Sequence, residues 1–305
     1  IFVSDAYASN VAENISVNWN NGIDNTLSCE TVSNELKVVG NFELTAPNSY
    51  NVTLGSRLRV TGNLVLDNPS ATGQFVLGAN DLTVEGNITN AGYGAVVTNG
   101  AGFLVKENVV TGGINHFPIA YTESNTATPV EATVTASGFT ALQNNILKVR
   151  TNNTDPVAAK GMGENGYDLN NLWTIDWTNN NGGADPKFAM NYKFLDNLIN
   201  DPGFTANKTI SYAAYWDLAP AATQWTTKKS TSSWNGSNGT QITDLNLETG
   251  STDWALFAGA TSFALSDAPT QAKNIQWISG DDRNLQFQWN RNGSNNQFYA
   301  ILGIE

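Results

Sequence analysis

Short runs of alternating apolar and polar residues recur at near-constant spacing in the first third of the chain. The pattern Leu-x-Val-x-Gly-Asn begins at Leu36, Leu58 and Leu82, and a weaker copy runs from Phe103 to Asn108. Alternation with a period of two places Leu and Val on one face of a strand. The Gly-Asn pair that follows predicts a corner, because both residues tolerate a positive φ.

Each copy is followed by further short strand-like runs. They begin at Phe42, Leu64, Ile88 and Val109, with another set at Val52, Phe75 and Ala95. A unit of three such strands cannot bury its own apolar face, so it must stack on its neighbours. The fold class that we predict is all-β, with a β-solenoid (parallel β-helix-like) over residues 1–112. Residues 1–35 cap its first coil or add an edge strand, and a run of hairpins in a sandwich is the alternative for the repeat.

The pattern changes after Gly112 and Gly113, where the repeat stops. Longer alternating runs follow, at 131–134, 146–150, 172–177, 188–192, 210–216, 225–227 and 254–257. Seven runs separated by Gly, Asn, Asp and Pro turns are typical of an antiparallel β-sandwich, which we predict over residues 113–266. One short helical turn is expected at 194–199.

Residues 267–305 form a third region with three alternating runs, at 272–277, 284–289 and 297–302. Asp281-Asp282 and Asn292-Gly293 mark the turns between these runs. The region predicts a small antiparallel sheet.

Segment 116–119, His-Phe-Pro-Ile, followed by Pro129-Val130, resembles the "FPVG … YxPV" segment of a sandwich module in secreted surface proteins of the Bacteroidota. Residues 172–175 and 257–259 support the resemblance, and Ala120 stands where Gly is usual.

Residues 267–305 look like the opening strands of a fibronectin type III domain from the same proteins. The resemblance is carried by Ala268-Pro269, by 285–289 (Leu-Gln-Phe-Gln-Trp) and by Gly293 to Phe298. Together the two resemblances imply a multidomain, adhesin-like surface protein exported by the type IX secretion route. The family has no shared catalytic residues to transfer.

The fibronectin-like region is incomplete, since such a domain needs about seven strands. Three strands leave their apolar face uncovered, namely Trp277, Phe287, Trp289 and Ile301. Either the chain continues past residue 305, or another copy completes the sheet by strand addition, as in a filament.

Charge and composition limit the classes of molecule that the protein can bind. The net charge is −12 and the 15 basic residues are scattered, which argues against nucleic acid. Only 14% of residues are charged, so amides and hydroxyls must supply the polar surface. No apolar run has the length of a membrane span. The chain starts at Ile1 and shows no signal peptide, which indicates a processed mature end or a fragment. We expect a secreted, extracellular or cell-surface protein.

Candidate chemistry is sparse. One His and one Cys disfavour the usual zinc sites and serine–histidine catalysis. We interpret His116, with Glu123 near it in sequence, as structural. The acids of the repeat do not recur at one repeat position, so no carboxylate pair for glycoside hydrolysis is predicted; they are Glu35, Glu43, Asp67, Asp81, Glu85 and Glu107. We predict no enzyme and no cofactor.

Two ligands stay open. Calcium takes clustered carboxylate oxygens, and Asp281 with Asp282, or Asp176 near Asp185, could contribute ligands. Carbohydrate stacks on aromatic rings, and a Thr- and Ser-rich stretch contains Trp216, Trp225 and Trp234. The alternative is that these Trp residues belong to a sandwich core, as we expect for Trp177 and Trp289.

The leading hypothesis is therefore an extracellular structural or adhesive protein, including a filament subunit whose partners are copies of itself or further domains of a longer chain. A carbohydrate-binding module with glycan partners is the alternative. A polysaccharide-degrading enzyme ranks last.

Overall fold

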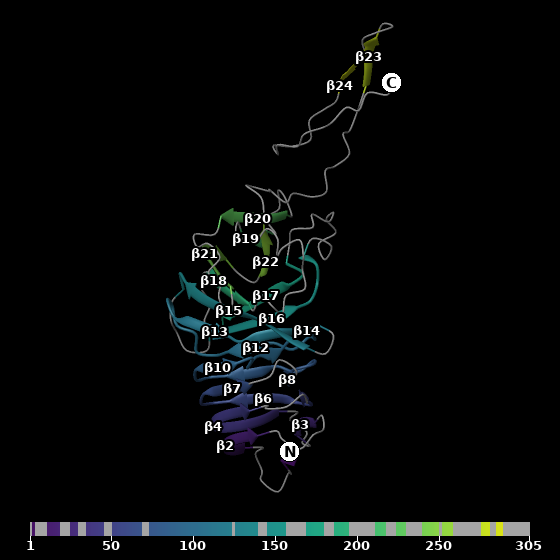
Figure 1. The fold of residues 1–305 in the computed structure, drawn as a ribbon. Coiled ribbons are helices and arrows are strands. Elements are labelled where there is room, and N and C mark those ends of the chain that lie inside the picture. The colour runs from purple at the N-terminus through teal and green to yellow at the C-terminus, as the bar shows by residue number, and fades with distance from the viewer. Residues whose placement is uncertain are drawn as a thin grey trace.

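The computed structural model has an all-β fold whose N-terminal part is a β-solenoid (Figure 1). The structure describes residues 2–3, 11–18, 25–29, 35–45, 51–68, 73–123, 126–139, 145–156, 169–179, 186–194, 211–217, 224–229, 240–249, 252–258, 276–280 and 285–288. Figure 1 shows the coils stacked along one axis, from the purple N-terminal strands to the teal strands that follow them.

Three parallel ladders form the faces of the solenoid. The first face contains the start of β4 (Glu35–Thr45), then β6 (Arg57–Val60), β9 (Leu82–Val84) and β12 (Leu104–Lys106). The second contains the end of β4, β7 (Leu64–Asn68) and β10 (Ile88–Gly92), and β2 (Val11–Asn18) pairs with both halves of β4. The third contains β1 (Phe2–Val3), β3 (Asn25–Cys29), β5 (Asn51–Leu54), β8 (Gln74–Val76), β11 (Val96–Val97) and β14 (Ile119–Glu123).

The predicted repeat sets the register of the coils. Leu58 lies beside Leu36 on one side and beside Leu82 on the other, and all three are fully buried. The Asn side chains also stack: Asn41 Oδ1 accepts the backbone N–H of Asn63 at 2.8 Å, and Asn63 Oδ1 accepts that of Asn87 at 2.8 Å. Each coil is therefore joined to the next by an apolar stack inside and an amide stack at the corner.

The corner glycines are needed for a reason that differs from the expected one. Of the three, only Gly40 has a positive φ. A Cβ at Gly62 would lie 2.4 Å from the Gly40 carbonyl oxygen, and one at Gly86 would lie 2.3 Å from that of Gly62. The backbones of successive coils approach so closely here that only glycine fits.

The fourth copy of the repeat is displaced by one residue from its predicted register. Leu104, not Phe103, pairs with Leu82, so Lys106 occupies the position of the buried Val84. The Lys106 ammonium donates to the carbonyl oxygens of Glu85 at 2.6 Å and Glu107 at 2.9 Å. The run predicted at Val109 is not a strand. The regular repeat thus ends in this coil.

Antiparallel strands then extend both sheets. On one sheet, β15 (Thr126–Ser137) pairs with β14 and β13 (Ile114–Phe117), and β18 (Lys187–Phe194) and β21 (Thr240–Thr249) follow. On the other, β12 pairs with β16 (Asn145–Asn152), followed by β17 (Leu172–Asn179), β22 (Thr252–Ala258), β19 (Ser211–Asp217) and β20 (Gln224–Lys229). β23 (Gln276–Gly280) and β24 (Leu285–Gln288) form a separate two-stranded sheet. The predicted turn at 194–199 lies outside the described residues, apart from Phe194.

One hydrophobic core runs through the solenoid and the antiparallel layers. It extends from Leu36 to Leu256 and includes residues of both sheets. In the antiparallel part, the rings of Trp173 and Tyr192 meet edge to face at 4.9 Å. Trp173 Nε1 also donates to the carbonyl oxygen of Val130 at 2.9 Å, which ties β17 in one sheet to β15 in the other. Trp177 is a core residue, as predicted.

Candidate functional site

The parallel ladder of the second face ends at β10. Among the described strands, β10 pairs with β7 alone, and β13, which lies beside it, pairs with β15. We call the boundary between β10 and β13 the seam. At the seam, side chains take the place of a backbone ladder.

Five polar side chains, which we call the seam network, connect the strands there. The Asn90 amide donates to Glu131 Oε1 at 2.6 Å, and Asn90 Oδ1 lies 2.9 Å from His116 Nε2. Because Asn90 Oδ1 can only accept, His116 Nε2 carries the proton. His116 Nδ1 then accepts from the Thr133 hydroxyl at 3.4 Å. Lys193 Nζ lies 3.4 Å from Glu131 Oε2 and completes the network.

The surroundings of His116 favour the neutral imidazole. Burial is the main cause that lowers the pKa of His116 below 6.5, and the positive charge of Lys193 lowers it further. Glu131, at 4.0 Å from His116 Nε2, acts in the opposite direction without reversing the shift. The Glu131 side chain is only 8% exposed, and its two oxygens already accept from Asn90 and Lys193.

The acid that the structure places beside His116 is Glu131, which sequence reasoning did not name. The sequence pointed to Glu123, the nearest acid along the chain, whose side chain is outside the described part of the structure. The reason is the antiparallel return of β15 along β13, which sets His116 opposite Thr133. If the sequence had been interpreted as a chain reversal between residues 117 and 130, Glu131 would have been expected near His116.

A second charged cluster, the Arg59 cluster, lies on the first face and contains Arg59, Glu35, Glu85 and Glu107. Arg59 Nε is 3.3 Å from Glu35, and Nη1 is 3.3 Å from Glu85 and 2.7 Å from Glu107. The hydrogen bond to Glu107 is the largest of the effects that raise the pKa of Arg59 above its ordinary value. The cluster spans four coils of the solenoid.

The Arg59 cluster also corrects an expectation about the acids of the repeat. Glu85 and Glu107 do share one repeat position: the Glu85 N–H bonds to the carbonyl of Val60, and the Glu107 N–H bonds to that of Val84. The one-residue displacement of the fourth copy concealed this stack. Arg59 lies within hydrogen-bond distance of both carboxylates, so it balances part of their charge.

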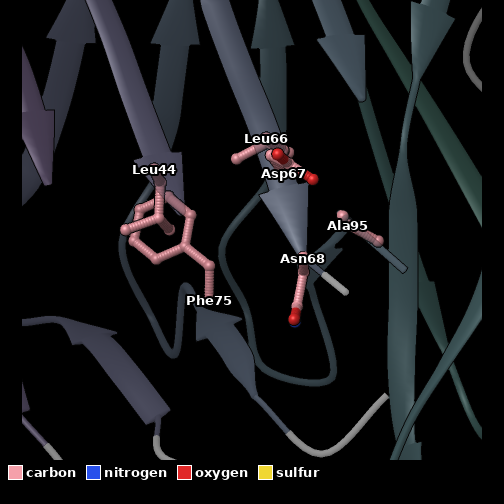
Figure 2. Close-up of a pocket in the computed structure, with 7 residues that line it drawn as sticks. Leu44, Leu66, Asp67, Asn68, Phe75 and Ala95 are labelled. Carbon is pink, nitrogen blue, oxygen red and sulfur yellow. The ribbon is translucent and has the colours of Figure 1, made fainter. Parts of the chain in front are cut away.

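A small pocket with a cavity volume of about 10 Å³ lies between the second and third faces. Figure 2 shows the Leu44 and Phe75 side chains at one side of it and Asp67, Asn68 and Ala95 at the other. The Asn68 amide donates to the carbonyl oxygen of Gly73. Such a cavity has room for about one water molecule, so it is far smaller than a typical small-molecule site.

The structure brings together two of the three Trp residues predicted to bind carbohydrate. Trp216 on β19 lies directly opposite Trp225 on β20 in the antiparallel register. The Trp216 side chain is half-buried, while its neighbour Tyr215 packs against the core at Trp254. Trp234 lies outside the described residues.

The other predicted site residues are only partly covered by the structure. Trp277 pairs with Phe287 in the β23–β24 sheet, whereas Trp289 and Ile301 lie outside the described residues. The calcium candidates Asp281, Asp282 and Asp185 also lie outside them. Asp176 is described, and it stands opposite Lys148 on β16. Within the described part of the chain, no group of three or more His, Cys, Asp or Glu residues could hold a metal ion.

Where the chain is described, it contains no helix long and apolar enough to cross a membrane. Comparison of the chain with protein families, with curated proteins and with solved structures found no match.

Proposed function

We propose that this protein is a structural or adhesive component of the cell exterior, as in the secreted surface proteins of the Bacteroidota that its sequence resembles. One observation carries the proposal. The two sheets run without interruption from the parallel coils into the antiparallel layers, over ten and twelve strands, around one core.

This architecture suits a role that depends on holding parts of a surface at a fixed separation. Successive coils are joined by ladder hydrogen bonds, by the Asn41–Asn63–Asn87 stack and by the Arg59 cluster. Two separately packed domains can bend relative to each other at their junction. Here one core continues through the junction between the coils and the antiparallel layers, so the junction resists bending. A stalk or a spacer needs this stiffness.

The test is the location and the loss of the protein in the organism that makes it. We expect antibody against the folded chain to label intact cells, and we expect deletion of its gene to reduce attachment or to alter the surface layer. Labelling only after the cells are opened would contradict the proposal. So would a deletion strain whose surface and attachment match those of the parent.

Assembly into a filament is the finer form of this proposal. It is supported by the β23–β24 sheet, which has two strands among the described residues, with Trp277 opposite Phe287. An added strand from a second copy would cover such a sheet. Electron microscopy of the native assembly tests it, and an assembly without a neighbouring chain at β24 or β23 would contradict it.

The register of Trp216 and Trp225 favours a second candidate, carbohydrate binding. Directly paired residues of antiparallel strands lie on the same face of a sheet, so Trp216 and Trp225 would together provide an aromatic platform for sugar rings. We expect Trp216→Ala with Trp225→Ala to abolish binding on a glycan array, while Gln224→Ala at the neighbouring position keeps it. Binding that survives the double substitution would place the site elsewhere. Polysaccharide degradation remains third, because Arg59 bridges the two stacked acids, Glu85 and Glu107.

A further inference from the structure

The seam is the place where the second face of the solenoid changes from a backbone ladder to side-chain bonds. β7 and β10 are joined by a parallel ladder of five residue pairs, from Ile88↔Leu64 to Gly92↔Asn68. Across the seam, Asn90 of β10 forms side-chain hydrogen bonds with His116 on β13 and with Glu131 on β15. Besides the core contacts of Phe117, β13 is therefore held on the solenoid side by a few polar groups in place of a backbone ladder.

One of these groups, His116, changes its charge in a mildly acidic range. In the neutral state every polar contact has a donor and an acceptor: Thr133 donates to Nδ1, and Nε2 donates to Asn90. A second proton on Nδ1 meets the Thr133 donor directly, so the hydroxyl must rotate away or reverse its role. The new charge is also partly buried, with an imidazole side chain that is 31% exposed.

The charges around His116 do not offset that burial. Two groups of β15, Glu131 and Thr133, face His116, and Lys193 is the charged group on β18. The group that faces it from β10 is Asn90, which is neutral. Glu131 attracts the imidazolium from 4.0 Å, but Lys193 already neutralises it from 3.4 Å. No other titratable side chain is present in the described residues of β10 and β13.

We propose that the seam network is an acid-sensitive lock: a neutral His116 holds β13 against the end of the solenoid, and protonation of His116 loosens that contact. Because the open and closed seam bind protons with different affinity, the stability of the closed seam depends on pH. The pKa of His116 in the folded protein is lower than 6.5, its ordinary value, so the opened seam binds a proton more readily than the closed one. The contribution of His116 is fully present above pH 6.5 and is lost as the pH falls through the folded pKa.

The lock predicts that mild acid weakens the structure first at the seam. It acts at the boundary between parallel and antiparallel layers, while the Asn stack and the apolar stack of the coils contain no group that titrates near pH 6. Acid would thus release the antiparallel layers from the second face before it disturbs the coils. This inference does not depend on the proposed surface role.

The chain contains one histidine, so its titration can be followed without assignment ambiguity. We expect the His116 Cε1–H resonance of the full chain to titrate with a midpoint below 6.5. Lys193→Gln should move the midpoint upward, because it removes a repelling charge. Lys187→Gln is the matched control: it removes the same charge from the other end of β18, opposite Ser137, and should leave the midpoint unchanged. A midpoint at or above 6.5 would overturn the proposal.

Hydrogen exchange measures the loosening itself. After correction for the intrinsic pH dependence, we expect faster exchange in β10 and β13 at pH 5 than at pH 7.5. The opening constant should rise by up to about tenfold for each unit by which the folded pKa lies below 6.5. His116→Gln, whose amide can donate to Asn90 but does not titrate, should remove the difference. Equal acceleration in that variant, or none in the wild type, would show that the network is not a lock. If His116→Gln does not fold, the Lys193→Gln exchange series decides: its acceleration at pH 5 should be smaller than that of the wild type, because the folded pKa of His116 then lies closer to 6.5.

Discussion

At the scale of single residues, the corner glycines show how a small side chain can fix a large architecture. Gly62 donates its N–H to the carbonyl of Gly40 at 2.8 Å, and Gly86 repeats that bond to Gly62 at 3.0 Å. The neighbouring coil occupies the space where a Cβ would be. At Gly62 and Gly86, the corner therefore selects glycine through contact between coils rather than through its own backbone angles.

Gly62→Ala tests this contact. We expect a loss of about 3 kcal/mol in the free energy of unfolding, because the new methyl group meets a backbone oxygen that cannot rotate away. Urea denaturation of the full chain gives the value. Gly78→Ala is the control: nothing lies within 4 Å of its Cβ, so only its left-handed backbone at φ +61° opposes alanine. We expect about 1 kcal/mol there, and equal losses at the two positions would contradict the explanation.

The Arg59 cluster tests the electrostatics of the first face. We expect Arg59→Met to lower the free energy of unfolding by about 1–2 kcal/mol at low salt, because three carboxylates lose their shared cation. The side chains are 18% to 33% exposed, so the loss should shrink in 1 M salt, where the screening length is about 3 Å. Urea titrations at both salt concentrations measure it. Arg57→Met, an exposed position on the same strand, should have little effect at either.

At the scale of elements, the coil is the unit that the chain repeats. Leu58 and Leu82 occupy equivalent positions in the first face, so residues 58–81 make up one full turn of the solenoid. If that turn were removed, β4 would pair with β9 and β10 instead of β6 and β7, and the residues that point into the core would be at equivalent positions. A repeat stack tolerates the loss of a whole unit because each coil contacts only its neighbours.

We therefore expect a chain lacking residues 58–81 to fold, with a lower melting temperature because it buries less apolar surface. A chain lacking residues 58–69, about half of the turn, should not fold, since its strands would be brought to the wrong faces. Circular dichroism and cooperative thermal melting distinguish the two. A folded half-turn deletion, or an unfolded full-turn deletion, would refute the equivalence of the coils.

At the scale of the whole molecule, the continuous core predicts coupled unfolding. Leu58 in the solenoid and Leu256 in the antiparallel part are both fully buried in the same cluster. Truncation of either to Ala should lower stability by about 2–5 kcal/mol and shift one shared transition. Calorimetry of the full chain, together with tryptophan fluorescence, checks this. Two separate transitions, each moved by only one substitution, would show independent units.

Much of the fold is predictable because its interactions are local or repeated. The alternation from Leu36 onward predicts the strands, and the constant spacing predicts that they stack in register. The apolar runs of the antiparallel part were also recognised, including the strand that contains Trp173. In contrast, β13, β14 and β21 were missed, since their alternation is weak.

The candidate sites were less predictable, since they depend on which strands become neighbours. The sequence placed Trp216 and Trp225 in separate strands, and only the β19–β20 pairing sets them opposite each other. The seam network joins residues from 90 to 193, and no local pattern connects them.

By itself, the sequence determined that this protein is built of strands, that its first part repeats, and that each repeat must bury Leu and Val against the next. Those conclusions follow from periodicity, which is a property of neighbouring residues. Only the tertiary structure decided where the repeat ends, that Glu85 and Glu107 share Arg59, and that His116 lies beside Glu131. The physical reason is the same in each case: a one-residue change of register or one antiparallel return changes which side chains meet, and neither changes the local pattern.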